Sequence, residues 1–215
     1  MKTTQQDRAP QRARLLLVCA AVLALNACSV LQPKATTPTA FYALEYSPPS
    51  GAAKATGPSP SVATTTTLIV SPVRAASGFD SQRIIYVREA HKIEYFSHSE
   101  WIDTPARMLG PLVVAAIAQT GGFRAVVTMP GSASGELRLD TEIVRLQQEF
   151  HTQPSSVHFT LRAYLVEEKT RKVLAWREFD AQAAASSDDP RAGVTAANQV
   201  VQTVLEELSQ FVLQN

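Results

Sequence analysis

Two long runs in the C-terminal half alternate apolar and polar residues, and they limit the fold more than any other feature of this 215-residue chain. They cover residues 136–143 and 157–166. Successive side chains of a strand point to opposite sides, so each run predicts a strand with one buried and one polar face. A third run, 173–180, follows turn residues at 169–172. Three strands with short connections predict an antiparallel meander, and the broken alternation at 144–146 predicts a bulge.

Shorter apolar runs bounded by turn residues predict further strands. These runs cover residues 41–46, 68–70, 83–87, 92–96 and 123–127. A helix is expected from Pro105, with Thr104 as its N-cap, to the glycine pair that follows Thr120. A second helix is expected after Asp189, with an apolar face that continues to Val212. This order predicts a single α/β (α+β) domain, with two main helices on a mixed, mostly antiparallel sheet.

Residues 1–27 have the features of a signal peptide. Basic side chains predominate over residues 1–14, and an apolar run follows at 15–25. A helix of about 11 residues rises only ~16 Å, which is about half of a bilayer core of ~30 Å. The run therefore predicts a secretory signal and not a membrane-spanning helix.

The segment Leu25-Asn26-Ala27-Cys28 at the end of this run resembles the lipobox of bacterial lipoproteins, although Asn26 departs from the small residue usual at its position. The resemblance implies that the Cys28 thiol takes a diacylglycerol and that cleavage frees its amine. The alternative is an ordinary signal peptide with a chance cysteine at its end. Ser29 follows, where an Asp would favour retention at the inner membrane, so we expect the outer membrane.

The predicted mature chain begins at Cys28 and has three parts. Residues 28–40 are the lipidated cysteine and a flexible tether, residues 41–215 are the folded domain, and 47–66 is a mobile loop within it. Four of the 20 basic and one of the 19 acidic residues lie in 1–27, so the mature chain has a net charge of −2. This balance argues against a nucleic-acid partner that binds through a basic face.

No arrangement of residues in the sequence predicts catalysis, a cofactor or a metal. The chain lacks the phosphate-loop, dinucleotide-binding, nucleophile-elbow and zinc-protease motifs. Ser97-His98-Ser99-Glu100 holds the residue types of a triad, but neighbours on an extended segment point to alternate faces. The histidines are expected to be solvated, without metal-ligand spacing: His91, His98, His151 and His158. We therefore expect no enzyme, no cofactor and no metal.

Four aromatic residues gather in a stretch of 16 just before the first helix: Tyr86, Tyr95, Phe96 and Trp101. One interpretation is that they pack in the core and against the helix. The other is that they form a surface facing a partner or lipid, since Tyr and Trp are enriched where one end is apolar and the other wet. On the second interpretation, all four are candidate partner-facing residues.

Taken in order, several segments of the mature chain resemble the ABC-type transport auxiliary lipoprotein family, the PqiC-like proteins. Tyr42-Ala43-Leu44 matches the Tyr-x-Leu strand of that family, and the arginine of its next motif is displaced here to Arg88. The other matching segments are Ser71-Pro72-Val73, Arg83-Ile84-Ile85-Tyr86, Ile93-Glu94-Tyr95-Phe96 and the run from Trp101 to Leu109.

The resemblance implies an outer-membrane lipoprotein that faces the periplasm and supports envelope integrity as a non-catalytic part of an ABC-type or MCE-type lipid transport system. Its partners would be the membrane, through the N-terminal lipid, and MCE-domain or ABC transporter subunits; association into a homo-oligomer stays open. The implied fold is α/β with a mixed sheet, similar to the N-terminal domain of TolB. The alternatives are a factor that assembles an outer-membrane protein complex and a periplasmic enzyme.

Overall fold

A computed structural model describes residues 37–47, 65–131 and 134–215. The folded unit is Thr39–Asn215. The predicted signal peptide, the lipobox with Cys28, and nearly all of the predicted 47–66 loop lie outside the described residues. The structure confirms one α+β unit with two main helices and a mixed sheet.

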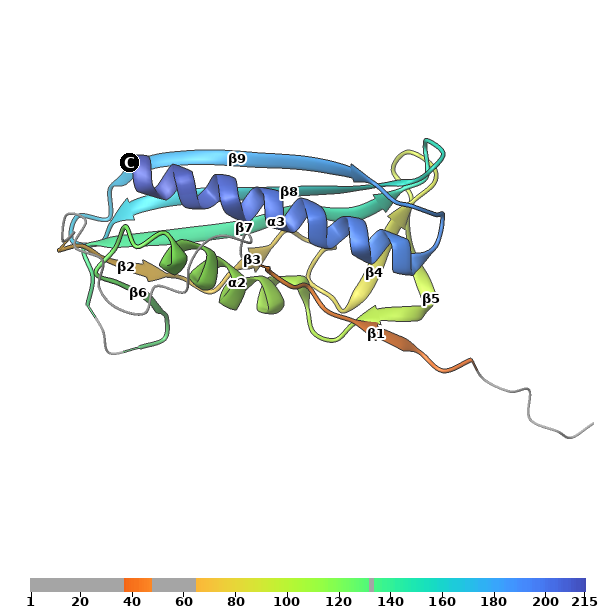
Figure 1. The fold of residues 1–215 in the computed structure, drawn as a ribbon, viewed down its shortest axis with the longest axis horizontal. Coiled ribbons are helices and arrows are strands. Elements are labelled where there is room, and N and C mark those ends of the chain that lie inside the picture. The colour runs from red at the N-terminus through yellow and green to blue at the C-terminus, as the bar shows by residue number, and fades with distance from the viewer. Residues whose placement is uncertain (1–36, 48–64, 132–133) are drawn as a thin grey trace, which may run out of the picture. The chain divides into compact units, whose positions relative to one another are not determined.

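The meander predicted from the alternating runs is present at one side of the sheet (Figure 1). Its strands are β7 (Leu137–Glu149), β8 (Ser156–Glu167) and β9 (Val173–Ala184), each antiparallel to the next. The register of β7 against β8 shifts between Ile143 and Arg145, which confirms the predicted bulge. Strands β7 and β9 both run beyond the predicted ends, because pairing continues past the point where strict alternation stops.

Short parallel strands fill the other edge of β7. Strands β2 and β3 pair with its first half, β4 pairs with its last residues, and β6 flanks β2. Strand β5 is antiparallel to β4, and β1 is parallel to β5. These strands are β1 (Ala40–Tyr42), β2 (Thr67–Val70), β3 (Arg74–Ala75), β4 (Arg83–Val87), β5 (Ile93–Trp101) and β6 (Ala125–Thr128). The long ladders are thus antiparallel and the short ones are mostly parallel. The pairing path β1-β5-β4-β7-β8-β9 has β1 and β9 at its opposite ends, and β6 ends a branch through β2.

Helices α2 (Pro105–Gln119) and α3 (Pro190–Gln214) cover one face of the sheet (Figure 1). Helix α3 lies along β8 and β9, and α2 packs on β2, β6 and α3. The Asp189 carboxylate caps α3 by accepting the N–H of Ala192 at 2.9 Å. Thr104 stands at the N-cap of α2 as predicted, but its hydroxyl makes no capping bond. Gly121 follows α2 with a φ of +66°, a conformation in which glycine pays no Cβ penalty.

The hydrophobic core lies between these helices and the meander. Apolar side chains at alternate positions of β7 and β8 meet the apolar stripe of α3, and most are fully buried. The largest of them are Leu139, Phe159, Leu161, Leu165, Phe179, Leu205 and Leu208. The opposite side chains of the meander point away from both helices, and we call this side the open face.

Candidate interaction surface

The open face of the meander is built from rows of side chains that cross its strands. The registers align Glu142 with Arg162 and Glu178, and they align Asp140 with Tyr164 and Trp176. Two further rows contain Arg145 with Thr160 and Asp180, and Gln147 with His158 and Gln182. Because cross-strand neighbours lie about 5 Å apart, each row brings side chains of three strands within contact distance.

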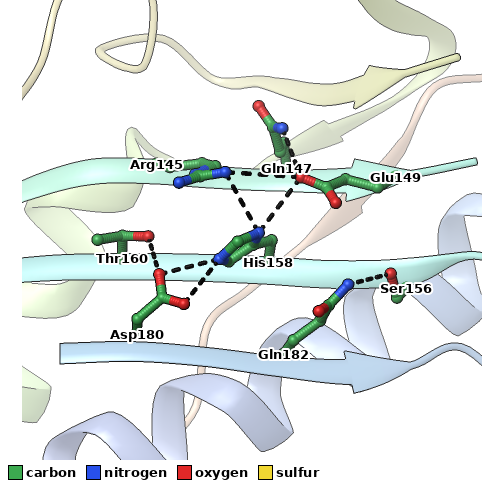
Figure 2. A network of polar contacts seen from close by, with 8 residues as sticks. All are labelled: Arg145, Gln147, Glu149, Ser156, His158, Thr160, Asp180 and Gln182. Carbon is green, nitrogen blue, oxygen red and sulfur yellow. Dashed lines mark hydrogen bonds and ion pairs between the residues drawn. The ribbon is translucent and has the colours of Figure 1, made fainter. Parts of the chain in front are cut away.

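His158 lies at the centre of a polar network on the open face (Figure 2). Its Nε2 is 2.9 Å from Asp180 Oδ1, and its Nδ1 is 3.3 Å from both Glu149 Oε1 and Arg145 Nη1. The hydroxyl of Thr160 also donates to Asp180, at 2.5 Å. The His158 side chain is only 16% exposed, so the prediction of a solvated histidine is wrong here. The alternation in β8 did not reveal the carboxylates, which come from other strands.

The Thr160 hydroxyl, with further help from His158, holds the pKa of Asp180 below its ordinary value. Arg162 is paired in the next row, 2.8 Å from Glu178 and 3.4 Å from Glu142. The hydrogen bond to Glu178 raises the pKa of Arg162 above its ordinary value. These charges compensate one another within the face, so the surface can be covered by a partner with less electrostatic cost than isolated charges would impose.

Apolar side chains mark the end of the open face at β9. The ring of Tyr164 stacks on Trp176 with centroids 6.3 Å apart, and Trp176 is 62% exposed. Val173 and Leu174 at the start of the same strand are also exposed. Trp176 is not among the candidate residues predicted from the sequence. The available signal was its position in register with Glu178 and Asp180, since an apolar ring on the polar side of a strand has no core to enter.

The structure does not bring the four candidate aromatic residues together in one surface. Trp101 is 3% exposed and belongs to the core, so the prediction that it faces a partner is wrong. Tyr86 and Phe96 are half-buried against each other, with centroids 4.5 Å apart, and both also contact the ring of Phe150. Tyr95 is 38% exposed, with the Arg83 guanidinium 5.0 Å from its ring centroid. Tyr95 is therefore the most accessible of the four.

The described parts of the chain hold no group of three or more His, Cys, Asp or Glu side chains placed to bind a metal. Within these same ranges, no helix is both long and apolar enough to cross a bilayer. The open face thus has a centre of paired charges and an aromatic margin at β9.

The family model for the ABC-type transport auxiliary lipoprotein component matches residues 42–209, which includes every strand of the meander and most of α3. The chain belongs to this family. Its members are described as lipoprotein components that are auxiliary to ABC-type transport. The match confirms the resemblance seen in the segments between Tyr42 and Leu109. No curated protein sequence matches the chain.

Solved structures share the fold of this family member. Protein XCC0632 from Xanthomonas campestris, of family DUF330, is 23% identical, with 82% of this chain and 95% of that chain covered and a TM-score of 0.69. An uncharacterized protein is 11% identical, with coverages of 82% and 99% and a TM-score of 0.62. The hypothetical protein CT253 from Chlamydia trachomatis is 10% identical, with coverages of 70% and 96% and a TM-score of 0.50. At these identities the similarity shows the fold alone.

Proposed function

We propose that this protein is a lipid-anchored, non-catalytic component of an ABC/MCE-type lipid transport system that docks a periplasmic subunit of the transporter. The family match over residues 42–209 carries the proposal. Cys28 supplies the anchor, with Leu25, Asn26 and Ala27 as its lipobox, and the protein stands on the periplasmic face of the outer membrane. Two or more acyl chains hold a protein stably on a membrane, so a triacylated Cys28 needs no spanning helix.

The open face of the meander is the docking surface in this proposal. Protein interfaces are enriched in Trp, Tyr and Arg, and a few such residues carry most of the binding energy. Trp176, Tyr164 and Arg162 stand in adjacent rows here, and the exposed ring of Trp176 offers the largest apolar area among them. The helices cover the other side of the sheet, so the partner has access to these side chains without a change in the fold.

The anchor is tested with the matched cysteine variants Cys28→Ala and Cys19→Ala. Cys19 lies inside the apolar run that is removed with the signal peptide, so its loss should leave membrane association and activity unchanged. Cys28→Ala should lose palmitate incorporation, leave the membrane fraction and fail to restore envelope integrity in a deletion strain. A Cys28→Ala protein that is free of the membrane but fully active refutes anchoring as part of the mechanism.

Docking is tested by placing a photo-crosslinking amino acid at residue 176 in intact cells. Thr203, an exposed position on α3, serves as the control because it lies on the helix-covered side. We expect crosslinks from residue 176 to an MCE-domain or ABC transporter subunit and none from residue 203. Crosslinks from residue 176 to outer-membrane β-barrel proteins would instead support an assembly factor.

A further inference from the structure

The edge of the sheet at β1 carries two large apolar side chains in water. Phe41 is 63% exposed and Ile102 is 62% exposed, as much as Trp176 at the opposite edge. Strand β1 is parallel to β5, with Phe41 opposite Glu100 and Tyr42 opposite Trp101. Ile102 follows directly, and its N–H donates to the carbonyl of Tyr42 at 2.8 Å. The two exposed side chains therefore stand on adjacent segments of one edge.

Phe41 and Ile102 are both exposed where β1 meets the end of β5. Tyr42 and Trp101, which alternate with them, pack against or within the core on the helix-covered side. Alternation along β1 then places Phe41 on the opposite side, and Ile102 lies exposed in the bend that follows β5. We call this pair the Phe41–Ile102 patch. Single exposed apolar residues are common, but this pair leaves two adjacent large side chains without any covering element among the described residues.

The position of the patch along the chain indicates what covers it. If Cys28 is the anchored residue, only residues 29–40 separate the bilayer from Phe41. Twelve residues span at most about 40 Å when fully extended, and less in any relaxed conformation. Phe41 is also the first aromatic residue after Cys28. Because the tether is short, it holds the patch close to the bilayer, and the effective concentration of lipid at the patch is therefore high.

We propose that the Phe41–Ile102 patch contacts the bilayer in which Cys28 is anchored and thereby sets the orientation of the domain. The inference rests on the anchoring in the proposed function. Retention does not need the patch, because the acyl chains already supply it. The patch instead selects among the orientations that a tethered domain would sample. With the β1 edge against lipid, the β9 edge with Trp176 lies at the far end of the strand order, where a periplasmic partner has access to it.

The test uses the mature lipidated protein in vesicles of phosphatidylethanolamine and phosphatidylglycerol. The sequence has two cysteines, of which Cys19 leaves with the signal peptide and Cys28 carries lipid, so an added cysteine is the single free thiol. Three labelled variants carry a polarity-sensitive fluorophore: Phe41→Cys, Ile102→Cys and the control Trp176→Cys. Trp176 matches Ile102 at 62% exposure, but it lies at the opposite edge of the sheet.

We expect blue-shifted emission and quenching by acyl-chain quenchers at residues 41 and 102, and quenching by aqueous iodide at residue 176. A double variant keeps the label at residue 102 and adds Phe41→Ser. This substitution should lower the membrane-facing population about tenfold, because 1.4 kcal/mol is tenfold and a buried Phe contributes at least that much. Trp176→Ser in the same background should leave the signal at residue 102 unchanged.

Vesicle flotation and palmitate incorporation are measured on the same samples, which separates the inference from the anchoring itself. A protein that floats with vesicles but shows residues 41 and 102 in water overturns the orientation proposal and leaves the anchor intact. A protein that does not float contradicts the proposed anchoring first. Equal burial at all three positions, or burial at residue 41 only after a partner protein is added, also overturns the proposal.

Discussion

Gly193, near the start of α3, faces the side chain of Gln148 on β7, and its substitution by alanine tests how the helix packs on the sheet. A Cβ at residue 193 would lie 2.1 Å from Oε1 and 2.6 Å from Cδ of Gln148. The Gln148 side chain is buried and cannot swing into solvent. Its Nε2 donates to Ser155 Oγ at 2.8 Å and to the carbonyl of Asp189 at 3.4 Å. The new methyl group must therefore displace either this amide or the helix.

Three contributions decide the net effect of Gly193→Ala on the free energy of unfolding. Alanine in a helix is favoured over glycine by about 1 kcal/mol. Overpacking a well-packed site costs about 1–3 kcal/mol, and leaving the displaced amide of Gln148 unpaired costs about 1–3 kcal/mol. We expect a net loss of about 1–5 kcal/mol, which lowers the melting temperature of a domain of this size by roughly 2–20 °C.

Urea unfolding of the wild type, Gly193→Ala, Gln148→Ala and the double variant measures this coupling. With alanine at residue 148 no amide opposes the new methyl, so the cost of Gly193→Ala should disappear there. Thr195→Ala, at an exposed position of the same helix, is the control and should stay within about 0.5 kcal/mol of the wild type. A Gly193→Ala protein as stable as the wild type, or one equally destabilised in both backgrounds, would refute the reasoning.

Three further predictions concern the core, the open face and the start of α3. Phe159→Ala removes a fully buried ring and should cost about 3–5 kcal/mol in urea unfolding; a loss under about 1 kcal/mol would contradict its place in the core. Asp180 has a lowered pKa, so its charge stabilises the fold above the unfolded value of about 3.9, and this contribution is lost as the pH falls through the folded value. Asp180→Asn should therefore be less stable than the wild type at pH 7, and its stability should fall less than that of the wild type as the pH is lowered. Thermal melts over a range of pH measure both effects, and parallel pH profiles of the two proteins would contradict the prediction. Asp189→Ala removes the cap on Ala192 and should cost about 1 kcal/mol of unfolding free energy. The helical circular dichroism signal should then be lost at a lower temperature than in the wild type, and an unchanged melting curve would show that the cap is dispensable.

The sequence predicts local structure well where one signal decides it. The alternation from residue 136 onward reports the faces of β7, and Asp189 with Pro190 marks the start of α3 because a carboxylate and a ring suit the first turn. It does not predict which strands become neighbours. The parallel pairing of Phe41 with Glu100 joins residues far apart in the chain, and no local pattern encodes that register.

The arrangement of the candidate site also could not be predicted from local sequence patterns. Trp101 stands in an aromatic run whose other members are half-buried or exposed, and only the pairing of β5 with β1 and the packing of the helix decide that it enters the core. The network around His158 depends on Asp180 and Glu149, which reach it from two neighbouring strands. Charge and alternation place these residues on one face, but their distances follow from register alone.

The pairing order along β7 has a consequence for how the chain reaches its native state. Strands β2 and β4 precede β7 by about 50 residues or more, so a chain that emerges N-terminus first exposes their unpaired edges until β7 is available. The meander and α3, by contrast, are contiguous in sequence, so their contacts close shorter loops than the pairing of β2 and β4 with β7, which favours their earlier folding. The last third of the chain is then the template on which the first strands assemble, and truncation from the C-terminus should leave them as substrates for proteases.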